Sequence, residues 1–396
     1  MGAMDKLETL AAAAQFDVCG YSGPRRPSNP ATSFIHRAAL PNGGSVCLMK
    51  VLMTNVCVND CAYCVNQVGR DVPRRSFAPD ELARLFIDIH ARRLAHGLFL
   101  SSGIGHDATR TMASMIDTVE ILRHRYEFRG YVHLKILPGA SFDTVEAACK
   151  LANRVSINME VPTAPHLARL TRHKDLHTDI VERMRWVKRL TDENERLAPS
   201  GQTTQFVVGA AGEADRDILR AVAALYGEVG LRRAYFSAFR PITDSRLEAA
   251  RPTPPLREHR LYQADWLLRV YGFAHQEVEL ALGQGGNLPL SKDPKLAAAE
   301  RQPWLFPVDV NRASYDDLLR VPGVGPTSAQ RITEARADHS IFALPQLEKM
   351  GVVTKWAAPF IWFRGMPAAE RQLSFMPELD DATTVEAEPA LAGVLG

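Results

Sequence analysis

The sequence predicts an α/β protein with a parallel β-sheet, followed by a separate all-helical C-terminal domain. Short apolar runs alternate with segments of helical periodicity from about residue 45 to residue 242. A proline-rich break at residues 251–255 ends this pattern, and two short helical segments later flank a Pro-Gly-Val-Gly turn. Strands that alternate with helices form βαβ units, whose strands are parallel.

Six strand–helix units account for the alternating region. Each expected strand is rich in β-branched and apolar residues, and each expected helix repeats apolar residues three or four positions apart. In the first helix, for example, Leu82, Leu85 and Ile89 share one face, and Pro79 precedes them as a start signal. The expected strands are 45–54, 98–103, 131–137, 155–161, 204–208 and 234–239. The expected helices are 80–94, 111–126, 142–152, 178–196, 215–226 and 258–270.

These elements divide the chain into five parts. We expect an N-terminal extension at 1–44, the α/β core at 45–250, and a helical and loop connector at 251–303. A hairpin domain follows at 304–366. The last part, 367–396, carries no Lys or Arg from Glu378 onward, and its acidic, polar composition predicts disorder.

Composition is that of an ordinary globular protein, with 46% hydrophobic and 23% charged residues among 396. The formal net charge is only +2, which permits a phosphate-bearing partner without requiring one. No apolar run is long enough to span a bilayer, and the first residues do not resemble a secretory signal. We therefore expect a cytoplasmic protein with reduced thiols.

Three cysteines dominate the chemistry of the chain. Cys57, Cys61 and Cys64 form a C-x₃-C-x₂-C run directly after the first expected strand. A tight loop can bring three thiolates to one metal centre, and iron–sulfur clusters are normally held by four. Three would leave one iron open to another ligand. A disulfide would need an oxidising compartment, and a structural zinc would need a distant fourth ligand.

Polar residues also mark two other strand ends. At the end of the second expected strand, Ser101 and Ser102 precede Gly103, and small residues allow a ligand to approach the backbone closely. On the fourth strand, Ser156, Asn158 and Glu160 alternate with apolar residues. Alternation places these three side chains on one face, which in a barrel points into the cavity.

The second motif lies near the C-terminus. A Pro-Gly-Val-Gly turn joins two short helices, and a helix N-terminus with nearby glycines can bind phosphate. A weaker second copy runs from residue 342 to residue 361. The residues that would meet phosphate in the first copy are Gly323, Gly325, Thr327, Ser328 and Arg331.

The C-x₃-C-x-aromatic-C run, with Tyr63 before the last cysteine, resembles the signature of radical S-adenosylmethionine (SAM) enzymes. The resemblance implies a partial (β/α)₆ barrel, a [4Fe–4S] cluster on the three cysteines, and SAM on the fourth iron. It also implies cofactor contacts at the strand ends described above. These expected contacts are Tyr63, Ser101, Ser102, Gly103, Ser156, Asn158 and Glu160.

The C-terminal copies resemble the helix-hairpin-helix DNA-binding motif. The whole chain resembles a bacterial group of radical SAM proteins assigned to DNA modification or repair, which is associated with a partner like uracil-DNA glycosylase. The resemblance implies an enzyme that acts on a DNA base or lesion and needs an electron donor. Two alternatives remain open: an RNA- or tRNA-modifying radical SAM enzyme, and a DNA-binding protein whose iron–sulfur cluster is structural or redox-sensing.

Overall fold

The computed structural model describes residues 2–15, 34–39 and 45–368. The chain forms two compact units, one of residues 1–282 with 286–294, and one of residues 283–285 with the chain from 295 onward. Each unit has its own sheet. Most of the acidic tail expected to be disordered, and much of the N-terminal extension, lie outside the described residues.

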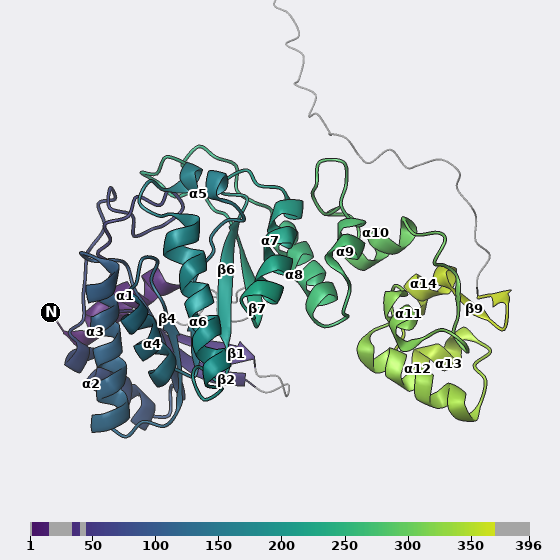
Figure 1. Ribbon diagram of the computed structural model, residues 1–396, viewed down its shortest axis with the longest axis horizontal. Coiled ribbons are helices and arrows are strands. Elements are labelled where there is room, and N and C mark those ends of the chain that lie inside the picture. The colour runs from purple at the N-terminus through teal and green to yellow at the C-terminus, as the bar shows by residue number, and fades with distance from the viewer. Residues whose placement is uncertain (1, 16–33, 40–44, 369–396) are drawn as a thin grey trace, which may run out of the picture. The chain divides into compact units, whose positions relative to one another are not determined.

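A seven-stranded sheet forms the centre of the described part of the first unit (Figure 1). Its strands neighbour one another in sequence order. The first strand pairs antiparallel with the second, and all later pairs are parallel. The strands are β1 (Ile35–Ala39), β2 (Ser45–Leu52), β3 (Gly97–Ser101), β4 (Tyr131–Lys135), β5 (Arg154–Ser156), β6 (Gln202–Val208) and β7 (Arg233–Ala238).

Helices precede, connect and follow the strands of this sheet, and several successive helices pack against one another. They are α1 (Ala3–Ala14), α2 (Pro79–Ala91), α3 (Ala108–Glu120), η2 (Ile121–Arg125), α4 (Phe142–Leu151), α5 (Ala164–Leu170), η3 (Leu176–Val181), α6 (Glu182–Glu193), α7 (Asp215–Glu228), α8 (Pro255–Arg269) and α9 (His275–Glu279). Helix α3 begins at a side-chain cap, because the Asp107 carboxylate accepts a hydrogen bond from the Arg110 N–H at 2.8 Å.

The expected parallel α/β architecture is confirmed. Helix α3 packs on α2 and α4, and α4 packs on α6, so the helices form a layer along the sheet (Figure 1). Every residue of β3 and of β6 is buried, as in parallel sheets that are covered on both faces. Six parallel strands in consecutive order, β2 to β7, form a partial (β/α)₆ barrel, and β1 extends the sheet beyond β2.

Two expected boundaries differ from the structure. The strand expected at 155–161 ends at Ser156, after which the chain is irregular. Helix α8, which we assigned to a connector, packs on β7 inside the first unit. The Tyr262 hydroxyl accepts the Phe236 N–H and donates to Phe236 O, each at 3.0 Å. The segment 251–303 is thus divided between the two units.

The second unit consists mainly of short helices with a small sheet. Its elements are α10 (Pro294–Glu300), β8 (Val308–Asp309), α11 (Tyr315–Arg320), α12 (Pro326–Asp338), α13 (Leu344–Lys349), α14 (Thr354–Ala357), η4 (Ala358–Phe360), β9 (Ile361–Phe363) and β10 (Met366–Pro367). Leu318, Ile332 and Leu347 are fully buried and form part of its core. In neither unit do the described helices include one of the length and apolarity that crossing a membrane requires.

Candidate functional site

The loop that follows β2 carries the three cysteines. The Cys64 N–H donates to Cys61 O at 2.9 Å, which closes a tight turn. Cys57, Cys61 and Cys64 all line one cavity, and all three thiols are free. Among the described residues, no group of three or more His, Cys, Asp or Glu could hold a metal ion as placed. The folded loop nevertheless gathers the three thiols at one cavity, and such a donor set suits an iron–sulfur cluster.

This cavity opens at the carboxyl ends of the parallel strands and has a volume of about 680 Å³. Ligand cavities typically measure about 300–1,000 Å³. Every parallel strand or the loop after it contributes to the lining. The polar and charged contributors include Asn59, Asn66, Ser101, Ser102, Lys135, Asn158, Glu160, Lys174, Gln205, Ser237, Arg240, Glu258 and His259.

Most of the expected cofactor contacts meet at this cavity. Tyr63, Ser101, Ser102, Gly103, Asn158 and Glu160 all line it. Ser156 is buried but is not among the lining residues, so the structure separates it from the others. β5 ends at Ser156, yet Asn158 and Glu160 beyond it line the cavity as the alternation predicted, although Glu160 does not continue the strand. Glu160 instead adopts a left-handed backbone with φ of 66° and exchanges hydrogen bonds with β6.

Two buried oxygens in the cavity lack a protein partner. Neither Ser102 Oγ nor Glu160 Oε2 has a hydrogen-bond partner within the part of the chain that the structure describes. Buried polar atoms are normally satisfied, and leaving one unpaired costs about 1–3 kcal/mol. Both oxygens lie where a bound ligand could supply the missing hydrogen bond. This arrangement fits a polar cofactor beside the cysteines.

Lys174 brings a buried positive charge to the cysteines. Its ammonium lies 3.8 Å from Glu160 Oε1. Burial lowers the pKa of Lys174, but Cys61 and Glu160 outweigh that effect and leave the pKa raised, so the ammonium stays charged. Burial, followed by the neighbouring Cys61, raises the pKa of Cys64 to about 12. No sequence pattern identified Lys174 as a candidate site residue, because it lies in an irregular loop.

Gly103 is small for a reason that the sequence analysis missed. A Cβ atom at this position would lie 2.5 Å from Val56 O and 3.3 Å from Cys57 Cβ. The Gly103 N–H donates to Thr54 O at 2.7 Å, which draws the two segments together. Gly103 therefore allows the cysteine loop to pack against the end of β3. This requirement for glycine does not depend on the ligand that the cavity binds.

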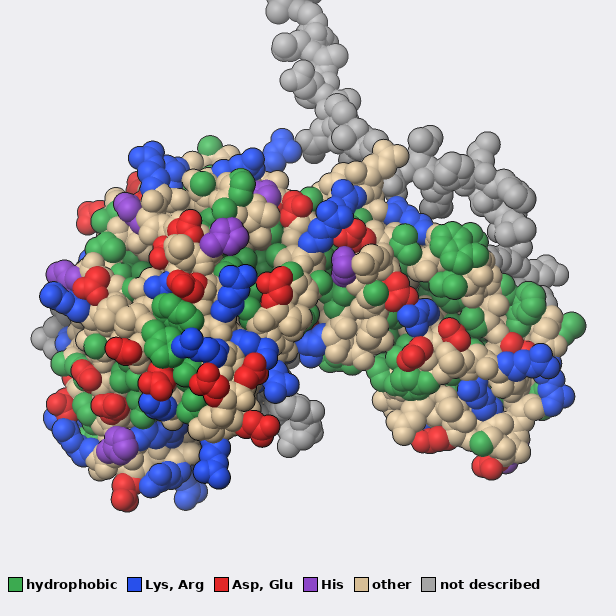
Figure 2. Space-filling view, in the orientation of Figure 1, with side chains coloured by type: hydrophobic (Ala, Val, Ile, Leu, Met, Phe, Trp, Pro, Cys, Tyr) green, Lys and Arg blue, Asp and Glu red, His purple; other side chains and the backbone are tan. Residues whose placement is uncertain are grey.

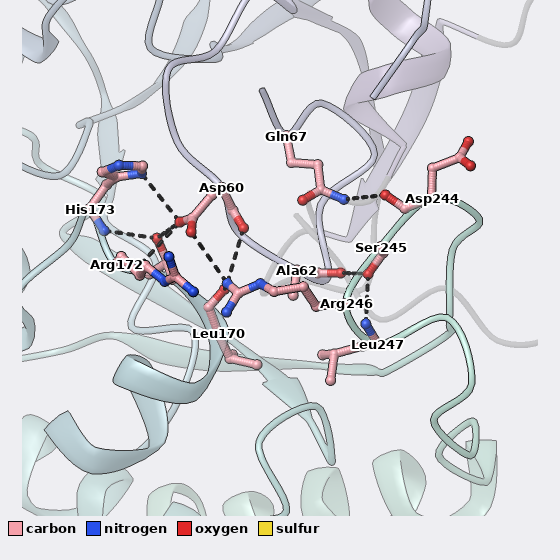
Figure 3. Close-up of polar contacts among 11 residues, drawn as sticks. Asp60, Ala62, Gln67, Leu170, Arg172, His173, Asp244, Ser245, Arg246 and Leu247 are labelled. Carbon is pink, nitrogen blue, oxygen red and sulfur yellow. Dashed lines mark hydrogen bonds and ion pairs between the residues drawn. The ribbon is translucent and has the colours of Figure 1, made fainter. Parts of the chain in front are cut away.

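A carboxylate inside the cysteine loop ties it to distant segments (Figure 3). Asp60 Oδ1 accepts the Thr171 hydroxyl at 2.7 Å and the Arg172 N–H at 3.0 Å. Asp60 also lies 3.3 Å from His173 Nδ1 and 3.4 Å from Arg246 Nη2. Although partial burial raises the pKa of Asp60, these hydrogen bonds and positive neighbours outweigh it, so the pKa is lowered.

The segment after β7 also holds the cysteine loop (Figure 3). The Ser245 hydroxyl donates to Ala62 O, and the Leu247 N–H donates to Ser245 Oγ at 3.0 Å. The Gln67 amide donates to Asp244 O at 3.3 Å. The loop between Cys61 and Cys64 is thus fixed by residues from the far end of the sheet.

Arg74 holds the other side of the loop through backbone carbonyls. Its guanidinium donates to Asn55 O at 2.6 Å, Asn66 O at 2.8 Å and Gln67 O at 2.7 Å. A planar guanidinium can serve several carbonyls at once in this way. Arg74 therefore shapes the loop as a structural residue.

In the second unit, the two hairpin turns pack against each other. Helices α11 and α12 flank the first turn, and α13 and α14 flank the second. The Val353 N–H donates to Gly323 O at 2.9 Å, which joins the turns. Gly323 has φ of 79°, and a Cβ there would lie 2.4 Å from Val353 O. Glycine is therefore required by both conformation and space.

The residues expected to meet phosphate differ in exposure. Thr327 and Arg331 are exposed, and Gly323 and Gly325 are partly exposed. Ser328 is buried at 6% exposure, close to Gly351. The Ser328 side chain thus packs inside the hairpin pair, so a role for it at the surface is not supported. Charges of both signs are mixed over the visible faces of both units (Figure 2).

Comparison with known proteins gives two kinds of match. The family model described as "Helix-hairpin-helix motif" matches residues 307–350. No curated protein sequence matches the chain. Several solved structures resemble a little over half of the chain.

One is the FeFe-hydrogenase maturase HydG from Carboxydothermus hydrogenoformans, with 13% identity over 55% of this chain and 50% of that chain, at a TM-score of 0.44. Methylornithine synthase (PylB) shares 14% identity over 55% of this chain and 60% of that chain, at a TM-score of 0.44. TsrM from Kitasatospora setae, a radical SAM methyltransferase with cobalamin and a [4Fe-4S] cluster bound, shares 15% identity over 61% of this chain and 43% of that chain, at a TM-score of 0.40. The match thus spans about half the length of these proteins.

Proposed function

We propose that this chain is a radical SAM enzyme that acts on nucleic acid, with DNA as the favoured substrate. One observation carries the enzymatic half of the proposal. The C-x₃-C-x₂-C loop lies at the carboxyl end of the first parallel strand, and its three thiols face a cavity that residues from all six parallel β/α units line. Chemistry in α/β folds is located at this end of the strands.

In this proposal Cys57, Cys61 and Cys64 hold a [4Fe–4S] cluster, and SAM binds the remaining iron. Such a cluster, when reduced, supplies the electron that cleaves SAM into methionine and a 5′-deoxyadenosyl radical. The surrounding residues bind and orient the cofactor. Five cysteines are free in the described part of the chain, which supports a reducing, cytoplasmic setting.

The unpartnered oxygens indicate how SAM would be held. Ser102 Oγ can hydrogen-bond a polar group of the amino acid moiety, and Glu160 Oε2 can accept a hydroxyl of the ribose. Asn158 and Tyr63 line the same cavity and can add polar contacts. Lys174 balances the negative charge of Glu160 and of thiolates nearby.

The hairpin pair supports nucleic acid as the substrate. The match to the helix-hairpin-helix model covers α11, α12 and α13. Backbone amides at such a turn bind phosphate without reading sequence, so the unit would hold the strand while a base enters the cavity. An electron donor must reduce the cluster, and a uracil-DNA glycosylase-like protein is the partner that the sequence resemblance suggests.

Anaerobic reconstitution with iron, sulfide and a reductant tests this proposal. With SAM present, 5′-deoxyadenosine should appear and should rise when duplex or single-stranded DNA is added. The Cys61→Ala variant should lose iron and produce none. A wild-type protein with a complete cluster that makes no 5′-deoxyadenosine, but binds DNA, would instead be a structural or redox-sensing iron–sulfur protein. Stronger competition by tRNA than by DNA would identify an RNA-modifying enzyme.

A further inference from the structure

A buried lysine lies beneath the first hairpin turn, outside the segment that matches the hairpin model. Lys295 is the second residue of α10 and is 7% exposed. Its ammonium donates to Val324 O at 2.5 Å, and Val324 itself is 3% exposed. A buried ammonium is costly to desolvate, so its position against the turn calls for a physical account.

The bond to Val324 O fixes the direction of the next N–H. The peptide between Val324 and Gly325 is trans, since the one cis peptide within the described residues is at 306–307. In a trans peptide the carbonyl and the N–H point in opposite directions. With the oxygen held inward by the ammonium, the Gly325 N–H points away from the buried side. Gly325 is the N-cap of α12, and no acceptor for its N–H lies within the described residues.

The second hairpin turn offers no equivalent donor. The Gly351 N–H donates to Glu348 O at 2.9 Å, and the Val352 N–H donates to Leu347 O at 3.1 Å. The Val353 N–H donates to Gly323 O at 2.9 Å. All three amides of that turn are therefore used inside the protein. The two hairpins look alike in sequence but differ in the donors that they present.

We infer that Lys295 is a positioning residue for a phosphodiester site at the first hairpin turn. It orients the Val324–Gly325 peptide so that the Gly325 N–H faces the ligand, and its charge polarises that N–H into a stronger donor. The inference rests on the proposed nucleic-acid function. It assigns phosphate binding to the first hairpin turn alone, and the second turn packs against the first and supports it.

The test measures binding of a fluorescently labelled DNA duplex to the full-length protein over a series of salt concentrations. Lys295→Met keeps the apolar stem and removes the ammonium, so affinity should fall about 3- to 10-fold. Its melting temperature should also fall, because the buried Val324 O loses its donor, so binding is measured well below the melting transition. Lys295→Gln keeps a donor without charge and should bind between the two. Lys150→Met, on α4, loses an exposed ammonium and should bind like wild type.

The salt dependence separates positioning from direct contact. Lys295 acts through the peptide, so the slope of log affinity against log salt should stay unchanged in Lys295→Met. A slope smaller by about 1 would show that Lys295 itself meets a phosphate and would overturn the inference. Equal affinity of the wild-type and Lys295→Met proteins would overturn it too. A wild-type protein that binds no DNA would instead remove the proposed function.

Discussion

Gly103 and Val56 are in such close contact that no side chain fits between them: a Cβ on Gly103 would lie 2.5 Å from Val56 O. Because the obstacle is backbone, Gly103→Ala must displace the cysteine loop from the end of β3. We expect a loss of about 1–3 kcal/mol in the free energy of unfolding and less iron per chain after reconstitution. Denaturant unfolding and iron analysis measure the two effects.

Gly105→Ala is the matched control for this change. A Cβ at Gly105 would meet no atom closer than 3.9 Å, so this variant should keep its iron and its stability. Equal iron content in the two alanine variants would show that the loop adapts to the extra methyl group.

The variant Ser102→Ala should separate an effect on SAM binding from an effect on protein stability. Ser102 Oγ is buried and unpartnered, so Ser102→Ala removes no hydrogen bond within the described protein. The free energy of unfolding should change by less than about 0.5 kcal/mol, whereas SAM affinity of the reconstituted protein should fall about 3- to 10-fold. Calorimetric titration with SAM and thermal melting measure the two. Ser114→Ala on α3 serves as the control, and an unchanged SAM affinity in Ser102→Ala would remove Ser102 from the cofactor site.

Asp60 should make the stability of the first unit depend on pH. Its pKa in the folded protein is lowered, so its contribution is present above the pKa of the unfolded chain and is lost as pH falls through the folded pKa. Wild type should therefore be more stable than Asp60→Asn near neutral pH, and the difference should shrink below about pH 4. The Asp60 side chain is 21% exposed, but its partners His173 and Arg246 are more exposed, so the difference should be at most about 1 kcal/mol.

Denaturant unfolding of both proteins across acid and neutral pH tests this expectation. Asp71→Asn removes an exposed carboxylate of the same region and is the control. Parallel stability curves for wild type and Asp60→Asn would show that the ties to Arg246 and His173 contribute nothing measurable.

Gly323 tests the contact between the two hairpin turns. Gly323→Ala combines a positive φ of 79° with a Cβ 2.4 Å from Val353 O. Gly365, in the same unit, has φ of 81° but no atom within 4 Å of a Cβ. Gly365→Ala should cost about 1 kcal/mol from backbone strain alone, and Gly323→Ala should cost more and weaken DNA binding. Measuring the melting temperature and the DNA affinity of each variant tests this expectation. Equal losses of stability in Gly323→Ala and Gly365→Ala would mean that the two turns separate easily.

Local patterns predicted the architecture, because alternating strands and helices leave a strong periodic signal. They also placed the three cysteines, whose spacing is local. They failed where distant segments decide the structure. Lys174 reaches the cysteines from a loop, Arg246 reaches Asp60 across the whole sheet, and Lys295 reaches Val324 from another helix. The early end of β5 was also hidden, because the alternating sequence does not mark Ser156 as its last residue, and Glu160 beyond it adopts a left-handed conformation that favours glycine.

The contacts of Ser245 with Ala62 and of Arg246 with Asp60, which fix the cysteine loop, have a consequence for biosynthesis. The ribosome makes the cysteines nearly two hundred residues before the segment that fixes their loop, since Ser245 and Ala62 are 183 positions apart. A nascent chain that has just exposed its cysteines lacks these contacts. We therefore expect cluster assembly to follow completion of the sheet, so that a chain stalled before β7 takes up iron poorly.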